Sequence, residues 1–174
     1  MVISGSIKLL SRYQDNPLKQ AAMVTKMQKS SDRITKIVQG LKSFSRYSEG
    51  VPHCNHNLCS IIKEAVVLTT PNAKDRGVEI ILNLNTDAEI FCGEIEIEQV
   101  LINLINNAID AVKDKKDKWV KIELKSLENM YSLQICDSGS GILKEVQGKM
   151  FEPFFTTKAV GEGTGLGLSI SRSI

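Results

Sequence analysis

The sequence predicts an α+β chain, in which an N-terminal helical hairpin is followed by an α/β sandwich with a mixed sheet covered by helices on one face. In the first 44 positions, apolar residues recur in steps of three and four, as they do in helices. The later part alternates helix-like and strand-like runs. Two of the strand-like runs are joined by a short turn, which predicts an antiparallel pair inside the sheet.

The hairpin is predicted from helices at residues 2–10 and 18–44, with Asp15-Asn16-Pro17 as the turn between them. The second helix has an apolar stripe formed by Met23, Met27, Ile34, Ile37, Val38, Leu41 and Phe44. Because these helices have nothing in their own segment to cover this stripe, we expect two chains to form a four-helix bundle, and therefore a homodimer. The alternative is that the hairpin packs only on the downstream part of its own chain.

The helical periodicity breaks at Ser48-Glu49-Gly50-Val51-Pro52, where we expect a domain boundary. Beyond it, the pattern predicts helices at residues 58–68 and 95–112 and a last helix from about Gly165. The predicted strands are residues 78–84, 89–92, 119–127 and 130–136, with a turn at Glu128-Asn129.

The composition is that of a soluble globular protein: of 174 residues, 42% are hydrophobic and 24% are charged. A net charge of +2, from 22 Lys and Arg against 20 Asp and Glu, argues against a nucleic-acid partner. The sequence contains no apolar run long enough for a bilayer and no leader pattern. We therefore expect a cytoplasmic segment that makes no membrane contact, and leave open whether a longer parent protein is membrane-anchored.

The four cysteines, Cys54, Cys59, Cys92 and Cys136, are irregularly spaced, which favours packed thiols over a disulfide framework. The stretch from His53 to Cys59 contains two His and two Cys, the usual zinc ligands. Zinc is kept only as an alternative there, because a closed site usually draws on two separated ligand pairs.

The helix predicted at residues 95–112 is apolar except for one stripe, formed by Gln99, Asn103, Asn106, Asn107 and Asp110. Asparagine is a poor helix former, so three of them on one face suggest a function. A plain solvated face is the alternative, although such a face more usually carries Lys and Glu. Carboxamides can present an oxygen to a hard cation and an amide to a phosphate.

Two glycine-containing segments follow. Asp137-Ser138-Gly139-Ser140-Gly141 comes directly after a strand and could be a plain turn, or could offer a carboxylate to an exocyclic amine such as that of adenine. The segment Gly161-Glu162-Gly163-Thr164-Gly165-Leu166-Gly167-Leu168 runs into a helix, and its backbone N–H groups could bind phosphate. It matches neither the P-loop nor the dinucleotide-binding pattern.

Between these glycine segments lies Phe151-Glu152-Pro153-Phe154-Phe155-Thr156-Thr157-Lys158. We interpret the three Phe as a hydrophobic anchor for a loop. Lys158 could belong to the same loop anchor or could reach a terminal phosphate, and the two interpretations are equally good.

Taken together, the ordered set Asn103-x-x-x-Asn107-Ala108, Asp137-x-Gly139-x-Gly141, Phe151-x-Pro153-Phe154 and Gly163-x-Gly165-x-Gly167 resembles the four ATP-binding boxes of bacterial sensor histidine kinases. The resemblance implies a Bergerat-type (GHKL-type) ATP-binding fold, with ATP held in a left-handed βαβ arrangement. It also divides the chain into residues 1–48, a dimerisation hairpin without the phosphoacceptor His, and residues 51–174, a catalytic ATP-binding domain that lacks its last strands.

The resemblance also implies roles for single residues. Asn107 would offer its side-chain oxygen to Mg²⁺, Asn103 would lie near the phosphates, and Asp137 would recognise the adenine amine. Residues 142–162 would form the ATP lid. Its flanks and the nucleotide contacts would come from Gly139, Gly141, Lys158, Gly163, Thr164, Gly165, Leu166 and Gly167.

The implied activity is protein-histidine kinase, in which the γ-phosphoryl group of ATP passes to a histidine on the bundle and then to an Asp of a response regulator receiver domain. Neither His53 nor His56 lies in the setting of the family's phosphoacceptor, so we expect autophosphorylation of the parent protein and not of this chain. Two alternatives remain, a GHKL-type ATPase and a nucleotide-controlled binding module. The ATPases have a Glu where this chain has Asn103, which leaves hydrolysis without its general base.

Overall fold

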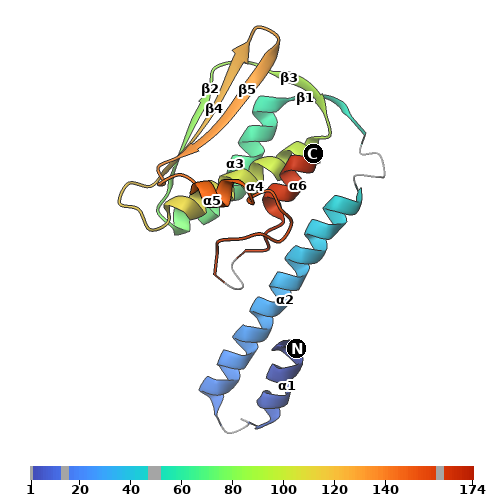
Figure 1. Cartoon of the computed structure of the whole chain (residues 1–174), viewed down its shortest axis with the longest axis vertical. Helices are drawn as coiled ribbons and strands as arrows, with labels where there is room; N and C mark the ends of the chain where they lie inside the picture. The colour runs from blue at the N-terminus through green and yellow to red at the C-terminus, as the bar shows by residue number, and fades with distance from the viewer. Residues whose placement is uncertain (1, 13–15, 47–51, 160–162) are drawn as a thin grey trace.

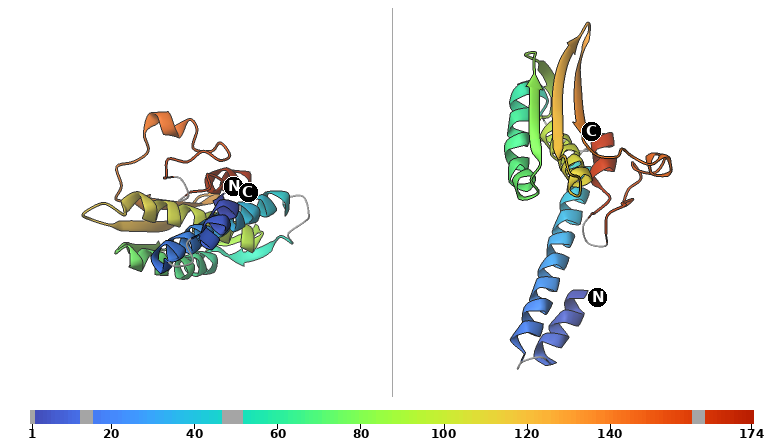
Figure 2. Two further views of the ribbon diagram at one scale, coloured as in Figure 1. Left: turned by 90° about the horizontal axis from the view of Figure 1, so that it is seen from below. Right: turned by 90° about the vertical axis from the view of Figure 1, so that its left-hand side faces the viewer.

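A computed structural model describes residues 2–12, 16–46, 52–159 and 163–174, arranged as a pair of long helices and an α/β unit (Figure 1). The pair consists of α1 (Val2–Arg12) and α2 (Pro17–Arg46), which lie side by side and project away from the rest of the chain (Figure 2). Asn16 begins α2, because its side-chain oxygen accepts from the Lys19 backbone N–H at 3.0 Å. The predicted helices at residues 2–10 and 18–44 agree closely with α1 and α2.

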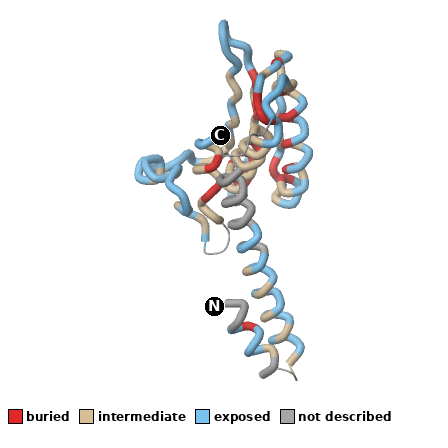
Figure 3. The backbone as a smooth tube through the Cα atoms, turned by 90° about the vertical axis from the view of Figure 1, so that its right-hand side faces the viewer, coloured by how far each residue is buried: buried red, intermediate tan, exposed pale blue. Residues whose placement is uncertain are grey.

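The long helices are mostly exposed, as the tube coloured by burial shows (Figure 3). In the predicted apolar stripe, Met23 and Met27 are half-buried and Ile34 is exposed. The side chains of Ile37, Val38, Leu41 and Phe44, the turn residue Asp15 and most of the predicted domain boundary fall outside the described residues. Besides packing on α1, α2 contacts the C-terminal helix α6 (Gly167–Ser173).

The α/β unit contains a three-stranded mixed sheet in the order β2-β4-β5. Strand β2 (Glu79–Leu84) is parallel to β4 (Trp119–Leu127), and β4 forms an antiparallel hairpin with β5 (Met130–Asp137). The register places Glu79 opposite Trp119 and Val120 opposite Asp137. A separate antiparallel pair joins β1 (Cys54–Asn57) to β3 (Glu89–Cys92).

Helices α3 (Leu58–Asp75) and α4 (Glu94–Val112) cover one face of the sheet, as expected. Along β4 the side chains alternate, so that Val120, Ile122 and Leu124 are fully buried against the helices. On the other face, Glu123 forms ion pairs with both Lys121 and Lys125. The core therefore lies between the sheet and the two helices, and it fixes which face of α4 remains polar.

Three local features differ from the prediction. Helix α3 continues past Leu68 and through Pro71 to Asp75, ending before Gly77, whose φ is +66°. Strand β1 was missed because Cys-Asn-His-Asn lacks strand-forming residues, and it is paired by its long-range partner β3. The region predicted as a lid contains a short helix, α5 (Lys144–Gln147).

Candidate functional site

The polar stripe of α4 lies on the side of the helix opposite its buried residues. The buried side is formed by Leu101, Ile105, Ala108, Ile109 and Val112. Asn103, Asn106, Asn107 and Asp110 are all half-buried rather than exposed. They are covered by other parts of the chain, so the alternative of a plain solvated face does not describe them.

Asn103 contacts the beginning of α6. Its Nδ2 donates to the Gly167 carbonyl oxygen and to Ser171 Oγ, both at 3.4 Å. A Cβ at Gly167 would lie 3.4 Å from the Asn103 side chain, in ordinary van der Waals contact, so the two residues are neighbours. The end of the predicted phosphate-binding segment is thereby held against the asparagine stripe.

One turn further along α4, Asn107 meets Lys158. The Lys158 Nζ donates to Asn107 Oδ1 at 3.3 Å and forms an ion pair with Asp110 Oδ2. Asn107 and Asp110 thus present oxygen atoms, the donors that magnesium prefers, at a point where the fold already places a positive charge. The Asn107 oxygen fits a divalent cation as a ligand, whereas Asp110 is already paired with Lys158 and Arg76.

Asn72 of α3 and Arg76, the residue that caps the C-terminal end of α3, complete this polar network, and the sequence analysis missed both. Arg76 forms an ion pair with Asp110 Oδ1, and its Nε donates to Asn72 Oδ1 at 2.9 Å. Asn72 in turn donates to Asn106 Oδ1 at 2.6 Å. Asn72 and Arg76 are four residues apart, as are Asn106 and Asp110, so the helical spacing matches. The signal was missed because the predicted helix ended at Leu68.

At the end of β5, Asp137 lies beside the next part of α4. Its Oδ1 accepts from the Gly139 backbone N–H at 2.8 Å. A Cβ at Gly139 would lie only 2.5 Å from that oxygen and 3.6 Å from the Ala111 Cβ. Ser138 ties the segment to the sheet, since its Oγ accepts from the Trp119 N–H at 3.1 Å. Gly141 follows with a φ of +77°.

The segment before α6 packs on the Phe-containing loop. Gly165 has a φ of +68°, and a Cβ there would lie 2.3 Å from the Phe154 carbonyl carbon. A Cβ at Gly163 would lie 2.7 Å from Thr156 Oγ1. Thr164 Oγ1 accepts from the Leu166 N–H at 3.4 Å, and the Leu166 side chain is buried. Glycine is therefore required at Gly165, where the close atoms are backbone, whereas the atoms near Gly163 belong to side chains.

The predicted site residues accordingly converge on the second half of α4. Gly167 contacts Asn103, Lys158 contacts Asn107 and Asp110, and Gly139 lies against Ala111. The Phe-containing loop joins through α6, where the Arg172 guanidinium lies 5.3 Å from the centre of the Phe151 ring. For Gly141 and Thr164 the structure shows local features, a φ of +77° at Gly141 and the hydrogen bond from the Leu166 N–H to Thr164 Oγ1.

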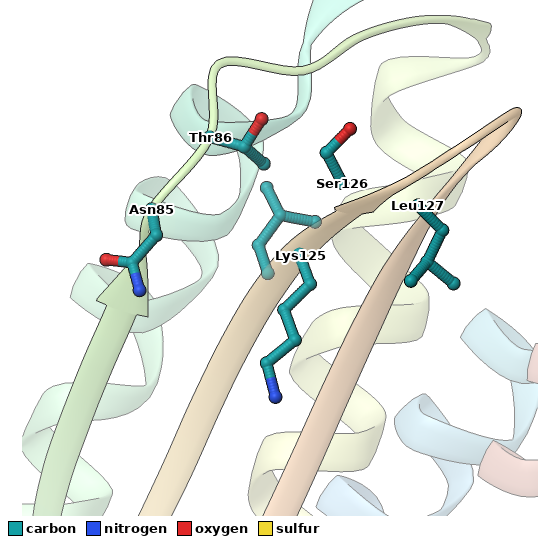
Figure 4. A pocket seen from close by; sticks show the side chains of 6 residues that line it. Asn85, Thr86, Lys125, Ser126 and Leu127 are labelled. Carbon is teal, nitrogen blue, oxygen red and sulfur yellow. The ribbon is translucent and has the colours of Figure 1, made fainter.

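The hollow between the ends of β2 and β4 is at the other end of the sheet (Figure 4). Its lining includes Leu124 and Leu127, whereas Asp137 pairs with Val120 near the start of β4. At about 3.3 Å per residue, the hollow begins more than 10 Å from the glycine segment. It takes no part in the candidate site.

The stretch from His53 to Cys59 does not assemble zinc ligands. Within the described ranges, no group of three or more His, Cys, Asp or Glu side chains could hold a metal ion. Residues 54–57 form β1, in which Cys54 Sγ lies 3.0 Å from His56 Nε2. Nor does any helix in the described part of the chain have the length and apolar character needed to cross a membrane.

Comparison with known proteins agrees with this geometry. The family described as histidine kinase-, DNA gyrase B-, and HSP90-like ATPase matches residues 92–174. The sensor protein FixL of Bradyrhizobium diazoefficiens is 30% identical over 175 residues, which cover 99% of this chain and 34% of FixL. The chain thus spans about a third of the length of this curated relative.

Solved structures are also similar. The catalytic domain of histidine kinase ThkA is 34% identical, with a TM-score of 0.63, over 71% of this chain and 79% of that domain. ThkA in complex with the response regulator protein TrrA gives a TM-score of 0.75 at 26% identity, over 99% of this chain and 48% of that one. The fold and the site define an ATP-binding domain of the histidine kinase type. The chain belongs to the sensor histidine kinase family.

Proposed function

We propose that this chain is part of the kinase core of a sensor histidine kinase. It binds ATP and supports transfer of the γ-phosphoryl group to a histidine on a dimerisation bundle, from which the group passes to an Asp of a response regulator. The observation that supports this most directly is that three separate segments contact one helix. Gly139, Lys158 and Gly167, one from each segment, lie against the polar stripe of α4 or its adjoining turn.

In this proposal, Asp137 accepts a hydrogen bond from the adenine amine, and Gly139 and Gly141 let the backbone approach the base. Asn107 offers Oδ1 to Mg²⁺, with Asn103 one turn earlier near the phosphates. Lys158 and the segment Gly163-Thr164-Gly165-Leu166-Gly167 lie on the phosphate side. Bound magnesium supplies neutralisation of the phosphate charge, and the task of the residues is to position the triphosphate and exclude water.

The domain assignment forms part of the same proposal. Residues 1–48 serve as the dimerisation hairpin and residues 51–174 as the catalytic ATP-binding domain. Ile34 of α2 belongs to the predicted apolar stripe and is exposed, and a second copy of the hairpin would cover it in a four-helix bundle. Both histidines of the chain, His53 and His56, lie outside residues 1–48, so the phosphoryl acceptor must come from another polypeptide segment.

The proposed partner is a response regulator receiver domain, supported by the structure of ThkA in complex with the response regulator TrrA. The proposed compartment is the cytoplasm, where ATP is available. A GHKL-type ATPase would need a general base for water at the position of Asn103, and a carboxamide does not supply one.

The test uses labelled ATP, magnesium, the chain and a separately purified phosphoacceptor bundle from a histidine kinase. The kinase assignment predicts transfer of label to the bundle as an acid-labile, base-stable phosphohistidine. Release of inorganic phosphate without labelled bundle would instead indicate an ATPase. Nucleotide binding with neither product would indicate a binding module, and both of these results contradict the proposal.

A further inference from the structure

Two cysteines distant in sequence lie opposite each other in the β1–β3 ladder. The register pairs Cys54 with Cys92, and directly opposed residues project to the same face of the ladder. The Leu58 N–H donates to the Ala88 carbonyl at 2.7 Å, and alternation from that pair makes Cys54 and Cys92 a hydrogen-bonded pair. Cα atoms in such pairs are about 5.5 Å apart, within the range of disulfides.

The two thiols have different surroundings. Cys54 is exposed, and its Sγ lies 3.0 Å from His56 Nε2. On the other side of the imidazole, Glu94 Oε1 lies 3.8 Å from Nδ1. The carboxylate is too far for a hydrogen bond but attracts a proton on Nδ1, and in that tautomer Nε2 can accept the thiol proton. Cys54 therefore has both access to solvent and a base.

Cys92 is 7% exposed, and burial raises the pKa of its thiol, with smaller contributions from Cys54, Glu94 and Glu96. Cys92 thus remains a neutral, shielded thiol until a reactive sulfur forms opposite it. This asymmetry, an accessible cysteine beside a base and a protected partner within bonding reach, suits a reversible pair better than a permanent bond.

We propose that Cys54 and Cys92 are a peroxide-responsive thiol pair that forms an intramolecular cross-strand disulfide. The Cys54 proton passes to His56, and the thiolate attacks hydrogen peroxide. The O–O bond breaks to give a sulfenic acid and a hydroxide, which takes the proton back from His56 and leaves as water. The Cys92 sulfur then attacks the Cys54 sulfur, the S–O bond breaks, and a second water leaves with the Cys92 proton. Two thiols and one hydrogen peroxide thus give one disulfide and two waters.

The position of the pair gives the bond a structural effect. In the described part of the chain, β1 pairs with β3 alone. Strand β3 runs through Gly93 directly into α4, the helix with the asparagine stripe. The disulfide would therefore tie the segment that enters the α/β unit to the start of the helix that organises the candidate site. The inference itself is independent of ATP binding.

The first experiment treats the reduced, folded chain with hydrogen peroxide, counts free thiols and maps crosslinked peptides by mass spectrometry without reduction. The expected result is a fall from four free thiols to two, a Cys54–Cys92 linked peptide within single chains, and recovery with dithiothreitol. Cys54→Ser and Cys92→Ala should each abolish the linked peptide. Cys136→Ser changes another exposed cysteine and should leave it unaffected.

The second experiment separates reactivity from folding. His56→Asn should slow alkylation of Cys54 by iodoacetamide roughly tenfold or more at a fixed pH, because the base is removed. Alkylation of Cys136 in the same sample should not change, and the melting temperature reports whether the variant folds. A linked peptide involving Cys59 or Cys136, a disulfide between chains, or full retention of four thiols after peroxide treatment overturns the proposal. An unchanged Cys54 rate in folded His56→Asn overturns the role of His56.

Discussion

Lys158 Nζ donates to Asn107 Oδ1, the oxygen that we propose as a ligand of magnesium, at 3.3 Å. The same ammonium group forms an ion pair with Asp110, which also pairs with Arg76 at the C-terminal end of α3. The Lys158 ammonium group, from the loop between α5 and α6, thus lies beside the proposed position of the cation. On the proposed assignment, binding of magnesium and the triphosphate would have Lys158 exchange Asn107 and Asp110 for a phosphate oxygen.

This exchange makes Lys158→Met a test of the phosphate contact. If Lys158 reaches the terminal phosphate, the variant should lose roughly tenfold in affinity for ATP and much less for ADP, because a charge-assisted hydrogen bond to the γ-phosphate is removed. Isothermal titration with both nucleotides measures the difference. Lys125→Met, which breaks an ion pair with Glu123 on the outer face of the sheet, is the matched control. Equal losses for ATP and ADP would argue against the assignment.

Asn107→Ala should remove magnesium-dependent ATP binding while leaving the fold intact. Changing a residue that only supports a metal ligand lowers metal affinity or activity about 10- to 100-fold. Loss of a ligand itself should lower the affinity for magnesium-ATP by at least the upper part of that range. Calorimetry with and without EDTA measures the effect, and circular dichroism checks the fold. Asn85→Ala, an exposed asparagine at the distal hollow, is the control. Unchanged nucleotide affinity in Asn107→Ala would refute the role of this residue.

Asp137→Asn should weaken ATP binding more than GTP binding. The asparagine can still accept from the Gly139 N–H with its remaining oxygen, as Asp137 does at 2.8 Å. Its new NH₂ group would then face the adenine amine, placing two donors together, whereas the guanine carbonyl could accept from it. Competition binding with the two nucleotides gives the ratio directly. The adenine role is wrong if both affinities fall by the same factor.

Gly165→Ala should disrupt the loop before α6. The new Cβ would lie 2.3 Å from the Phe154 carbonyl carbon, at a backbone φ of +68°, and left-handed conformations cost an L-residue about 1–2 kcal/mol before any clash. We expect the free energy of nucleotide binding to change by more than the free energy of unfolding, because the strain is local to the loop. Gly148→Ala, in the same region with nothing within 4 Å of the added Cβ, should have little effect on either quantity. Equal behaviour of the two variants would contradict the requirement for glycine.

Periodicity predicted the elements that contain their own apolar pattern. Strands β3 and β4 have the predicted bounds, and α4 differs by one residue at its start. Strand β1 has no such pattern, because its Cys-Asn-His-Asn sequence becomes a strand only when β3 is beside it. Local propensity also could not show that α3 passes through Pro71, where buried Ala73 continues the packed face beyond the proline.

The residue types of the candidate site could be predicted from the sequence, but the contacts between its helices could not. The asparagine stripe and the two glycine segments could be read from residue types, and the structure brings parts of each together on α4. The links between helices could not be read in this way. Asn72 and Arg76 reach Asn106 and Asp110 across the α3–α4 contact, and a contact between helices depends on tertiary packing that a single sequence does not display.

Ser138 is bound into the sheet by hydrogen bonds in both directions with Trp119, whereas Gly163 and Gly165 rest on a loop. On the proposed assignment, the adenine-binding segment is therefore preformed. The phosphate-binding loop would have to close around the nucleotide after the base has bound. Capture would then proceed in two stages with separate rates, and adenosine alone could complete only the first.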